Sequence, residues 1–406
     1  MTRMPPEVGN LEVKMHSDTH IVRQRFRVSY EYPVAFTEGL FTPENSLLLS
    51  TVTAYEPERQ HRLFFCIDSG VMDAWPGLIT DIHRYIHSHS ASMSLACEPV
   101  IIQGGEACKN DPQLVQALLT KFADDGVDRQ SFVVAIGGGA VLDMVGYAAG
   151  TAHRGIRLIR VPTTVLSQND AGVGVKNGVN AFGNKNFLGT FCPPFAVLND
   201  VRFIDTLEDR DKRAGMAEAV KVALIRDAQF FEWLCEHSAE LGRFERSAMA
   251  YMIRRCAELH LQHIATSGDP FEYGSARPLD FGHWAAHKLE VLTDHALRHG
   301  EAVAIGIALD SCYSVEAGLL PEEALETICG LFDDVGLACT HDLLEASGVD
   351  GRLLIVAGLE EFRQHLGGEL TVTMLRKLGE GVEVHEIDEG LLLRSIDRLM
   401  RRARAA

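Results

Sequence analysis

Apolar and polar positions follow different periods in the two halves of the chain. Between residues 23 and 200, short apolar runs suited to strands are separated by segments with helical spacing. The predicted strands lie at 23–41, 62–68, 94–105, 155–164 and 196–200, the predicted helices at 73–90 and 106–126, and 131–150 combines a strand, a glycine turn and a helix. This alternation predicts a parallel sheet with helices on both faces, which binds ligands beyond the carboxyl ends of its strands.

From about residue 201 onward, apolar residues recur with the helical period over long segments. Two such segments lie at 206–241 and 247–267, and a strand-like run at 369–375 interrupts the helical remainder. We therefore expect a polar leader at 1–22, an α/β domain at 23–200 and an all-α domain at 201–406.

Glycines mark two segments of the first half. Gly137–Gly139 stand between a predicted strand and helix, where backbone N–H groups can approach a pyrophosphate, although a tight packing turn has the same composition. Residues 162–194 are glycine-rich, mostly loop and longer than an ordinary connector. This stretch carries Asp170, Lys176, Lys185 and Asn186. Lysines among glycines suit a phosphate ligand, and a flexible surface flap is the alternative.

Histidines concentrate between residues 276 and 306. His283 and His287 are one helical turn apart, and His299 follows a predicted loop. Imidazoles on helices near a carboxylate suit a divalent metal site, whereas polar histidines at helix ends are the plainer interpretation. Glu218 and Lys221, one turn apart in an apolar helix, fit either a structural ion pair or a carboxylate ligand for that site.

Charge and cysteine usage narrow the possible partners and location. A formal charge of −18 argues against nucleic acid or an anionic membrane surface as a partner. The nine cysteines form no CxxC pair, and no apolar run is long enough for a signal core or a membrane span. We expect a cytoplasmic protein.

A set of motifs occurs in an order typical of one enzyme family. They are GGE-x-x-K (Gly104–Lys109), GGG-x-x-x-D (Gly137–Asp143), HRG (His153–Gly155), PTT (Pro162–Thr164), VGVK-x-GVN-x-x-G-x-KN (Val173–Asn186), AGMAEAVK (Ala214–Lys221), FGH-x-x-x-H (Phe281–His287) and HGEAVAIG (His299–Gly306). On these motifs the chain resembles the sugar phosphate cyclases, whose best-known member is 3-dehydroquinate synthase.

The resemblance implies an N-terminal Rossmann-like NAD-binding α/β domain and a C-terminal all-α metal-binding domain, with the active site between them, in a homodimer. Family members bind zinc, or cobalt in some, at positions matching Glu218, His283 and His299, so that His287 would face the substrate. The NAD contacts would be Asp68, Glu106, Lys109, Gly138, Gly139, Thr163, Thr164 and Thr206. The substrate pocket would hold Asp143, Arg154, Asp170, Lys176, Lys185, Asn186, Lys221, Asp280 and His287.

The chemistry implied by the resemblance conserves the cofactor. NAD+ transiently oxidises a secondary alcohol of a sugar phosphate, the metal polarises the resulting ketone, and phosphate is eliminated. The alcohol is then restored, the ring opens, and an intramolecular aldol reaction closes a carbocycle. Lys176, Lys185, Asn186 and Arg154 would hold the phosphate, and His287 would relay protons.

Departures from the synthase pattern bear on the substrate. Asp280 replaces an asparagine, and the lysine expected upstream of His283 is absent, with Gln262 near its place. Arg277 is the nearest arginine, and Arg363 and His365 are possible substitutes for a later lysine segment. Losing cations that help to bind a substrate carboxylate favours a neutral ketose phosphate.

The lysine loop is similar to that of the 2-epi-5-epi-valiolone synthases, which cyclise sedoheptulose 7-phosphate, so we favour this substrate. HGEAVAIG and HKLE are closer to the dehydroquinate type, and synthase-like proteins of bacterial secondary-metabolite clusters are also similar. The alternatives are a true 3-dehydroquinate synthase, a metal-dependent polyol dehydrogenase, and a binding protein on a degenerate cyclase fold.

Overall fold

The structure is a computed structural model that describes Val22, Gln24, Phe26 and residues 28–266, 278–365 and 368–405. By its internal contacts the chain forms two compact units, Met1–Glu31 and Tyr32–Ala406. The predicted leader, apart from Val22, and Arg277 lie outside the described residues, and His365 is described only by its backbone.

The larger unit contains a seven-stranded sheet in the order β1–β9–β6–β5–β2–β3, with β4 also paired to β2. Every pair in this sheet is parallel, as the alternation of strands and helices predicted. The strands are β1 (Val34–Thr37), β2 (His61–Asp68), β3 (Met93–Leu95), β4 (Val100–Ile102), β5 (Phe132–Gly137), β6 (Arg157–Pro162) and β9 (Ala196–Asp200).

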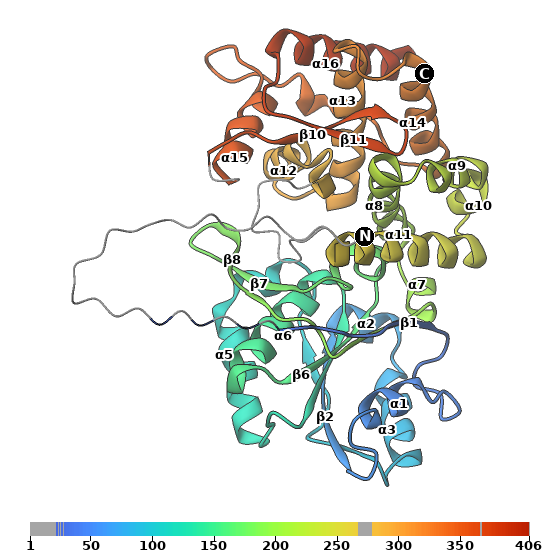
Figure 1. The fold of residues 1–406 in the computed structure, drawn as a ribbon, viewed down its shortest axis with the longest axis vertical. Coiled ribbons are helices and arrows are strands. Elements are labelled where there is room, and N and C mark those ends of the chain that lie inside the picture. The colour runs from blue at the N-terminus through green and yellow to red at the C-terminus, as the bar shows by residue number, and fades with distance from the viewer. Residues whose placement is uncertain are drawn as a thin grey trace, which may run out of the picture. The chain divides into compact units, whose positions relative to one another are not determined.

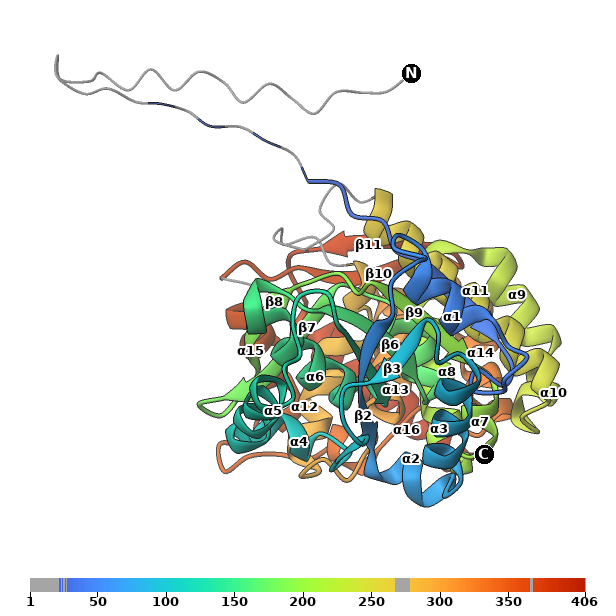
Figure 2. The ribbon, with the colours of Figure 1, turned by 90° about the horizontal axis from the view of Figure 1, so that it is seen from below.

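Both faces of this sheet are covered, because its central strands are apolar on both sides. In β2, Leu63, Phe65 and Ile67 join one apolar cluster, whereas Phe64 and Cys66 join another. Helices α1 (Leu47–Thr53), α3 (Leu78–Ser88) and α7 (Arg202–Asp205) pack on the first face, and α5 (Pro112–Asp124) and α6 (Gly139–Thr151) on the second (Figure 2).

The strand predicted at 23–41 is wrong over most of the described part of that range. Only Val34–Thr37 pairs with the sheet, as β1. A strand with alternating residues buries one of its faces, but the Val28 and Tyr30 side chains are both 61% exposed. Alternation of apolar and polar residues therefore occurs here in a segment that buries neither of these side chains.

The prediction of mostly loop at 162–194 is also wrong in part. After a single π-helical turn, η2 (Ser167–Ala171), strands β7 (Lys176–Ala181) and β8 (Asn184–Phe191) form an antiparallel hairpin. At its tip Phe182 and Gly183 both have positive φ, as a two-residue hairpin turn of type I′ requires. The sequence signal for that turn is Asn-Gly or Asp-Gly, which Phe182–Gly183 lacks.

The rest of the larger unit is predominantly helical, which confirms the predicted fold class (Figure 1). Its main helices are α8 (Asp209–Arg226), α9 (Ala228–Glu236), α10 (Ser238–Gly242), α11 (Arg246–Thr266), α12 (His283–Leu292), α13 (His299–Glu316), α14 (Glu322–Val335), α15 (Ala357–His365) and α16 (Glu389–Ala405). One antiparallel hairpin, β10 (Val372–Lys377) with β11 (Glu380–Val384), accounts for the strand-like run at 369–375.

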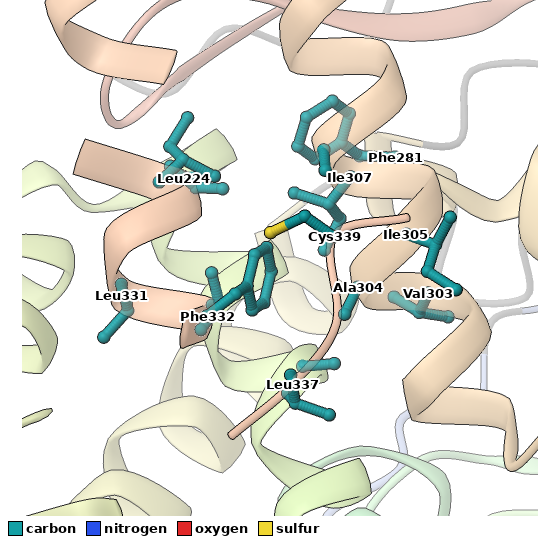
Figure 3. Packing of buried hydrophobic residues seen from close by; sticks show 14 of the residues in the cluster. Leu224, Phe281, Val303, Ala304, Ile305, Ile307, Leu331, Phe332, Leu337 and Cys339 are labelled. Carbon is teal, nitrogen blue, oxygen red and sulfur yellow. The ribbon is translucent and has the colours of Figure 1, made fainter. Parts of the chain in front are cut away.

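A single large apolar cluster holds these helices together around α13, most of which is buried. Figure 3 shows Leu224 of α8, Phe332 of α14 and Ile307 of α13 in this cluster, with Cys339 beside them. Among the described residues, no helix has the length and apolar character needed to cross a membrane.

Candidate active site

Three side chains from three helices of the larger unit converge on one point. Glu218 belongs to α8, His283 begins α12 and His299 begins α13. Oε1 of Glu218 lies 3.8 Å from Nε2 of His283 and 3.5 Å from Nε2 of His299. One possible ligand atom from each residue lies within 4.8 Å of the others. The structure thus brings together the three residues that the resemblance implied as metal ligands.

Close packing of α8 against α13 sets this geometry. A Cβ added to Gly300 would lie 1.7 Å from the carbonyl oxygen of Ala214, so only glycine allows the start of α13 to approach α8 this closely. Next to Gly300, His299 reaches the carboxylate of Glu218. The backbone contact between the helices therefore fixes the separation of the two side chains.

The other histidine is oriented by a buried aspartate. Asp310 of α13 accepts hydrogen bonds from the Gly282 backbone N–H at 2.9 Å and from the Trp284 indole N–H at 2.7 Å, on either side of His283. Gly282 has a φ of 78°, a left-handed conformation that caps the start of α12. Burial raises the pKa of Asp310 to about 7, although both donors favour its ionised form.

Second partners turn both histidines toward Glu218. Nδ1 of His283 lies 3.1 Å from the Phe281 carbonyl oxygen, and Nδ1 of His299 lies 3.3 Å from Oε2 of Glu290. If Nδ1 carries the proton in each ring, Nε2 presents its lone pair to the shared point. A histidine that donates from Nδ1 to a carbonyl or carboxylate is typical of metal-binding imidazoles.

The charges of the cluster are strongly perturbed. Burial and the charge of Lys221 lower the pKa of His283 to about 3. Burial also disfavours the charged form of His299, but contacts with Glu218 and Glu290 outweigh it and raise the pKa of His299 to about 9. Burial opposes ionisation of Glu218, yet Lys221 and the two histidines hold its pKa well below the ordinary value.

Glu218 has the character of a metal ligand as well as an ion-pair partner. It is fully buried, and neither carboxylate oxygen makes a hydrogen bond of good geometry to the described residues, although the Lys221 ammonium lies against Oε2. A buried carboxylate with such orphaned oxygens, facing two imidazole nitrogens, fits a divalent cation such as Zn²⁺ or Co²⁺. Oε2 of Glu218 thus meets Lys221, as the ion-pair interpretation predicted, and Oε1 faces the two imidazoles, as the ligand interpretation requires.

His287 and Lys185 lie at the outer side of the cluster. The ring of His287 is 5.5 Å from that of His283 and 6.2 Å from that of His299, centroid to centroid, and its side chain is exposed. Lys185 of β8 donates to Oε1 of Glu290 at 3.3 Å, so the hairpin reaches the cluster. Asp280 lies in the short turn η3 (Pro278–Asp280) directly before α12.

A cavity of about 450 Å³ opens beside the β7–β8 hairpin. Its lining contains most residues that the sequence assigned to the substrate loop, together with some that it did not: Asp143, Asp170, Ala171, Gly174, Val175, Lys176, Asn177, Gly178, Asn186, Gly189, Thr190, Phe191, His260 and Ile264. Its volume lies in the range of small-molecule sites.

Lys109 links the residues implied for NAD binding to those implied for the substrate pocket. Assigned by resemblance to NAD, it is buried in α4 (Ala107–Asn110) and pairs with Asp143 at 2.8 Å. The same ammonium contacts Oδ1 of Asn186. Lys109 therefore connects α4 to two residues expected in the substrate pocket.

His260 of α11 lines the cavity, a position that the sequence analysis did not identify. Nδ1 of His260 lies 2.9 Å from the Asp170 carboxylate. Burial works against ionisation of Asp170, but His260 holds its pKa below the ordinary value. Gln262, which stands near the sequence position of the absent lysine, lies two residues farther along α11 and is exposed.

Two candidate cations are not brought to this cavity. Arg154 is exposed, has a φ of 64°, and makes no hydrogen bond or ion pair with another described residue. Arg363 is held by Glu360 and by the Gly368 carbonyl oxygen, and it lines a different cavity. As a substitute for the missing lysine segment, Arg363 is therefore a wrong suggestion.

The residues implied for NAD follow the carboxyl ends of the strands. Asp68 ends β2 and accepts from the Gly70 N–H at 2.9 Å, Gly138 and Gly139 open α6 after β5, and Thr163 and Thr164 follow β6. Glu106 precedes α4 and accepts from Asn180 at 2.9 Å, whereas Thr206 ends α7 with its hydroxyl bonded to the Phe203 carbonyl oxygen.

At this edge of the sheet, glycines let neighbouring segments approach one another closely. A Cβ on Gly104 would lie 2.1 Å from Oδ1 of Asp68, and one on Gly138 would lie 3.3 Å from Thr164. The start of α6 has no side-chain cap, so its first N–H groups are not bonded by a capping residue. A glycine cradle at a helix N-terminus fits a pyrophosphate.

Comparison with known proteins agrees with this arrangement. The family model described as 3-dehydroquinate synthase N-terminal matches residues 99–214, and that described as 3-dehydroquinate synthase C-terminal matches residues 215–353. A glycerol dehydrogenase from Schizosaccharomyces pombe, 14% identical with a TM-score of 0.58 and 92% of each chain covered, shares the fold alone. The fold and the two family models thus define an α/β-plus-helical protein of the 3-dehydroquinate synthase type.

More similar relatives identify the family. A 3-dehydroquinate synthase of Cereibacter sphaeroides is 34% identical over 300 residues, which span 73% of this chain and 80% of the relative. A 2-epi-5-epi-valiolone synthase of Streptomyces glaucescens is 32% identical over 386 residues, 93% of each chain. The solved 2-epi-5-epi-valiolone synthase of Streptomyces hygroscopicus, with NAD+ and Zn²⁺ bound, is 29% identical with a TM-score of 0.81 over 94% of this chain and all of that one. The chain belongs to the sugar phosphate cyclase superfamily.

Proposed function

We propose that the protein is an NAD- and zinc-dependent cyclase that converts a neutral ketose phosphate, sedoheptulose 7-phosphate in preference, into a carbocycle with loss of phosphate. The observation that carries the choice of substrate is the charge of the cavity. Lys176 is the only lysine or arginine among the described residues that line it, and His260 is engaged by Asp170. This lining suits one anionic group on the substrate and offers little to a second.

Similarity supports the same choice. The valiolone synthase of Streptomyces glaucescens aligns over 93% of both chains, whereas the dehydroquinate synthase of Cereibacter sphaeroides aligns over 73% of this one. Because several dehydroquinate synthases are more identical to this chain where they align, that activity is the second candidate.

The described residues fit both cofactors. Glu218, His283 and His299 would hold the metal, while Asp68, Gly138 and Thr164 belong to the edge that would hold NAD. When bound, NAD+ accepts and returns a hydride, and the metal ion acts as a Lewis acid toward a substrate oxygen. Cobalt would serve the same donor set.

The chain's own residues would bind the substrate and move its protons. Lys176, Lys185 and Asn186 lie on one hairpin and would hold the phosphate by charge and hydrogen bonds. His287, exposed beside the two histidine ligands, would exchange a proton with a substrate hydroxyl. Asp170 would fix the imidazole of His260 toward the substrate's uncharged end.

Phosphate release tests this proposal. NAD- and zinc-loaded protein is offered sedoheptulose 7-phosphate or 3-deoxy-arabino-heptulosonate 7-phosphate, while NADH absorbance is followed. We expect phosphate release from the first substrate without NADH accumulation. Fast release from the second alone would establish the dehydroquinate reaction, and NADH accumulating on simple polyols without phosphate release would establish a dehydrogenase.

A matched pair of variants ties the activity to the metal. Glu218→Gln removes the buried carboxylate, and Glu208→Gln makes the same change at an exposed position just before α8. We expect Glu218→Gln to lose both metal and phosphate release, and Glu208→Gln to keep both. Full activity in metal-free Glu218→Gln protein would contradict a metal-dependent cyclase.

A further inference from the structure

Arg160 is a fully buried arginine in β6 that takes part in none of the contacts described above. The terminal N–H groups of its guanidinium donate hydrogen bonds to one short stretch, residues 172–177. Nη1 donates to the carbonyl oxygens of Gly172 at 3.0 Å and Gly174 at 2.9 Å. Nη2 donates to the carbonyl oxygen of Lys176 at 2.8 Å and to Oδ1 of Asn177 at 2.6 Å.

No carboxylate forms a hydrogen bond with this guanidinium among the described residues. Asp143 is close enough to interact electrostatically with Arg160, but its carboxylate accepts a hydrogen bond from the Lys109 ammonium instead. The Nε–H of Arg160 has no partner in the described part of the chain. Burying a charge without a hydrogen-bonded counter-ion is costly, so a structural role alone would be better filled by an apolar side chain.

The stretch that Arg160 holds is part of the cavity wall. Gly174, Val175, Lys176 and Asn177 all line the cavity, and Lys176 begins strand β7. A second contact presses on the same stretch, because a Cβ on Gly146 of α6 would lie 1.8 Å from Oδ1 of Asn177. Contacts with Arg160 and with α6 therefore both fix the position of the first residues of β7.

We propose that Arg160 is a positioning residue for substrate binding, which fixes Lys176 and the 172–177 stretch so that the cavity can receive the phosphate of its ligand. The buried positive charge acts in the same direction, since it makes the electrostatic potential of this wall more favourable to an anion. The role in turnover rests on the proposed cyclase function, whereas the role in anion binding does not.

The test compares two Arg→Lys changes in one strand. Arg160→Lys keeps the charge but cannot reach all four acceptors, since lysine carries three donors on one nitrogen. Arg157→Lys is the control, because Arg157 begins β6 and bonds Glu56 and Gln130. For both NAD- and zinc-loaded variants we would measure hydrogen exchange of residues 172–177 with and without inorganic phosphate, NAD affinity, metal content, and kcat and KM.

In Arg160→Lys we expect exchange at 172–177 to rise about tenfold, because charge-assisted hydrogen bonds to that stretch are lost. Inorganic phosphate should slow this exchange in wild type and in Arg157→Lys, but not in Arg160→Lys at the same concentration. With substrate, kcat/KM should fall about tenfold, mainly through KM, while NAD affinity and metal content stay unchanged.

Unchanged exchange at 172–177 in Arg160→Lys, or exchange that rises equally over the whole sheet, would overturn the proposal. A KM equal to that of wild type would also overturn it. If wild type turns over neither ketose phosphate, the cyclase function fails, and the phosphate-dependent exchange still decides the role of Arg160.

Discussion

Replacing Glu290 by glutamine tests whether the contacts behind the histidines hold the proposed metal site. Glu290 is 5% exposed and accepts from Nδ1 of His299 and from Nζ of Lys185, both at 3.3 Å. Burial opposes its ionisation, but His299 and Lys185 lower its pKa to about 2, so the carboxylate is charged at neutral pH. Glutamine keeps the size of the side chain and removes the charge.

The structure allows the magnitude to be estimated. The variant turns one buried hydrogen bond with a charged acceptor into a neutral one, and such bonds contribute about 1.5–3 kcal/mol. Loss of a carboxylate behind a metal-binding histidine lowers metal affinity by about 10–100-fold, which corresponds to about 1.4–2.7 kcal/mol. The two ranges agree, so we expect Glu290→Gln to weaken Zn²⁺ binding by at least about tenfold.

The assay is a titration of metal-free protein with Zn²⁺ in competition with a chromophoric chelator. Glu361→Gln is the matched control, because Glu361 lies in α15, pairs with Lys288 and is 56% exposed on its side chain. Its Zn²⁺ affinity should equal that of wild type. A folded Glu290→Gln protein that binds Zn²⁺ within about twofold of wild type would refute the reasoning that Glu290 orients His299.

Three further outcomes are expected. Gly300→Ala should destabilise the fold by about 1–3 kcal/mol in urea unfolding, because its Cβ would lie 1.7 Å from the Ala214 carbonyl oxygen, whereas Gly330→Ala in α14, with nothing within 4 Å, should be neutral or stabilising. Equal unfolding midpoints for the two would contradict the packing argument. The raised pKa of Asp310, about 7, means that wild type loses stability from this group as pH rises from about 4 to 7, by at most about 4 kcal/mol. The advantage of wild type over Asp310→Asn in unfolding free energy should therefore shrink over that range, and a constant difference would count against it. Removing metal with a chelator should lower the unfolding free energy by about 2.7 kcal/mol relative to protein at a free Zn²⁺ concentration of 100 Kd, and an unchanged value would argue against a bound ion.

Much of the fold could be predicted because periodicity reports local burial. Strands such as β2, apolar on both faces, and helices such as α3 are visible from the sequence. The β7–β8 hairpin was not, since most side chains of β8 are exposed and its turn has an unusual residue pair, Phe182–Gly183. Where a strand buries no face, its sequence carries little pattern.

In the site too, local spacing could be predicted from the sequence, whereas contacts between distant segments could not. The spacing of His283 and His287 predicted a shared helix face but could not tell which of the two lies against Glu218, because that depends on how α12 packs on α8. Glu290 was missed although it lies seven residues after His283, a spacing that returns to the same helix face. His260 had no signal of its own, since its partner Asp170 is distant in sequence.

The charged side chains of the site form one continuous series of contacts, which links β8, α12, α13 and α8. Lys185 of the hairpin contacts Glu290 of α12, Glu290 contacts His299 of α13, and His299 faces Glu218 of α8, whose other oxygen meets Lys221. His299 thus lies between two carboxylates, each balanced by one lysine. In the proposed function, a phosphate that drew Lys185 away from Glu290 would leave more negative charge facing His299, and this would strengthen the hold of Glu290 on its Nδ1 proton. Through this series, an anion bound at the hairpin would act on the proposed metal ligands without touching them.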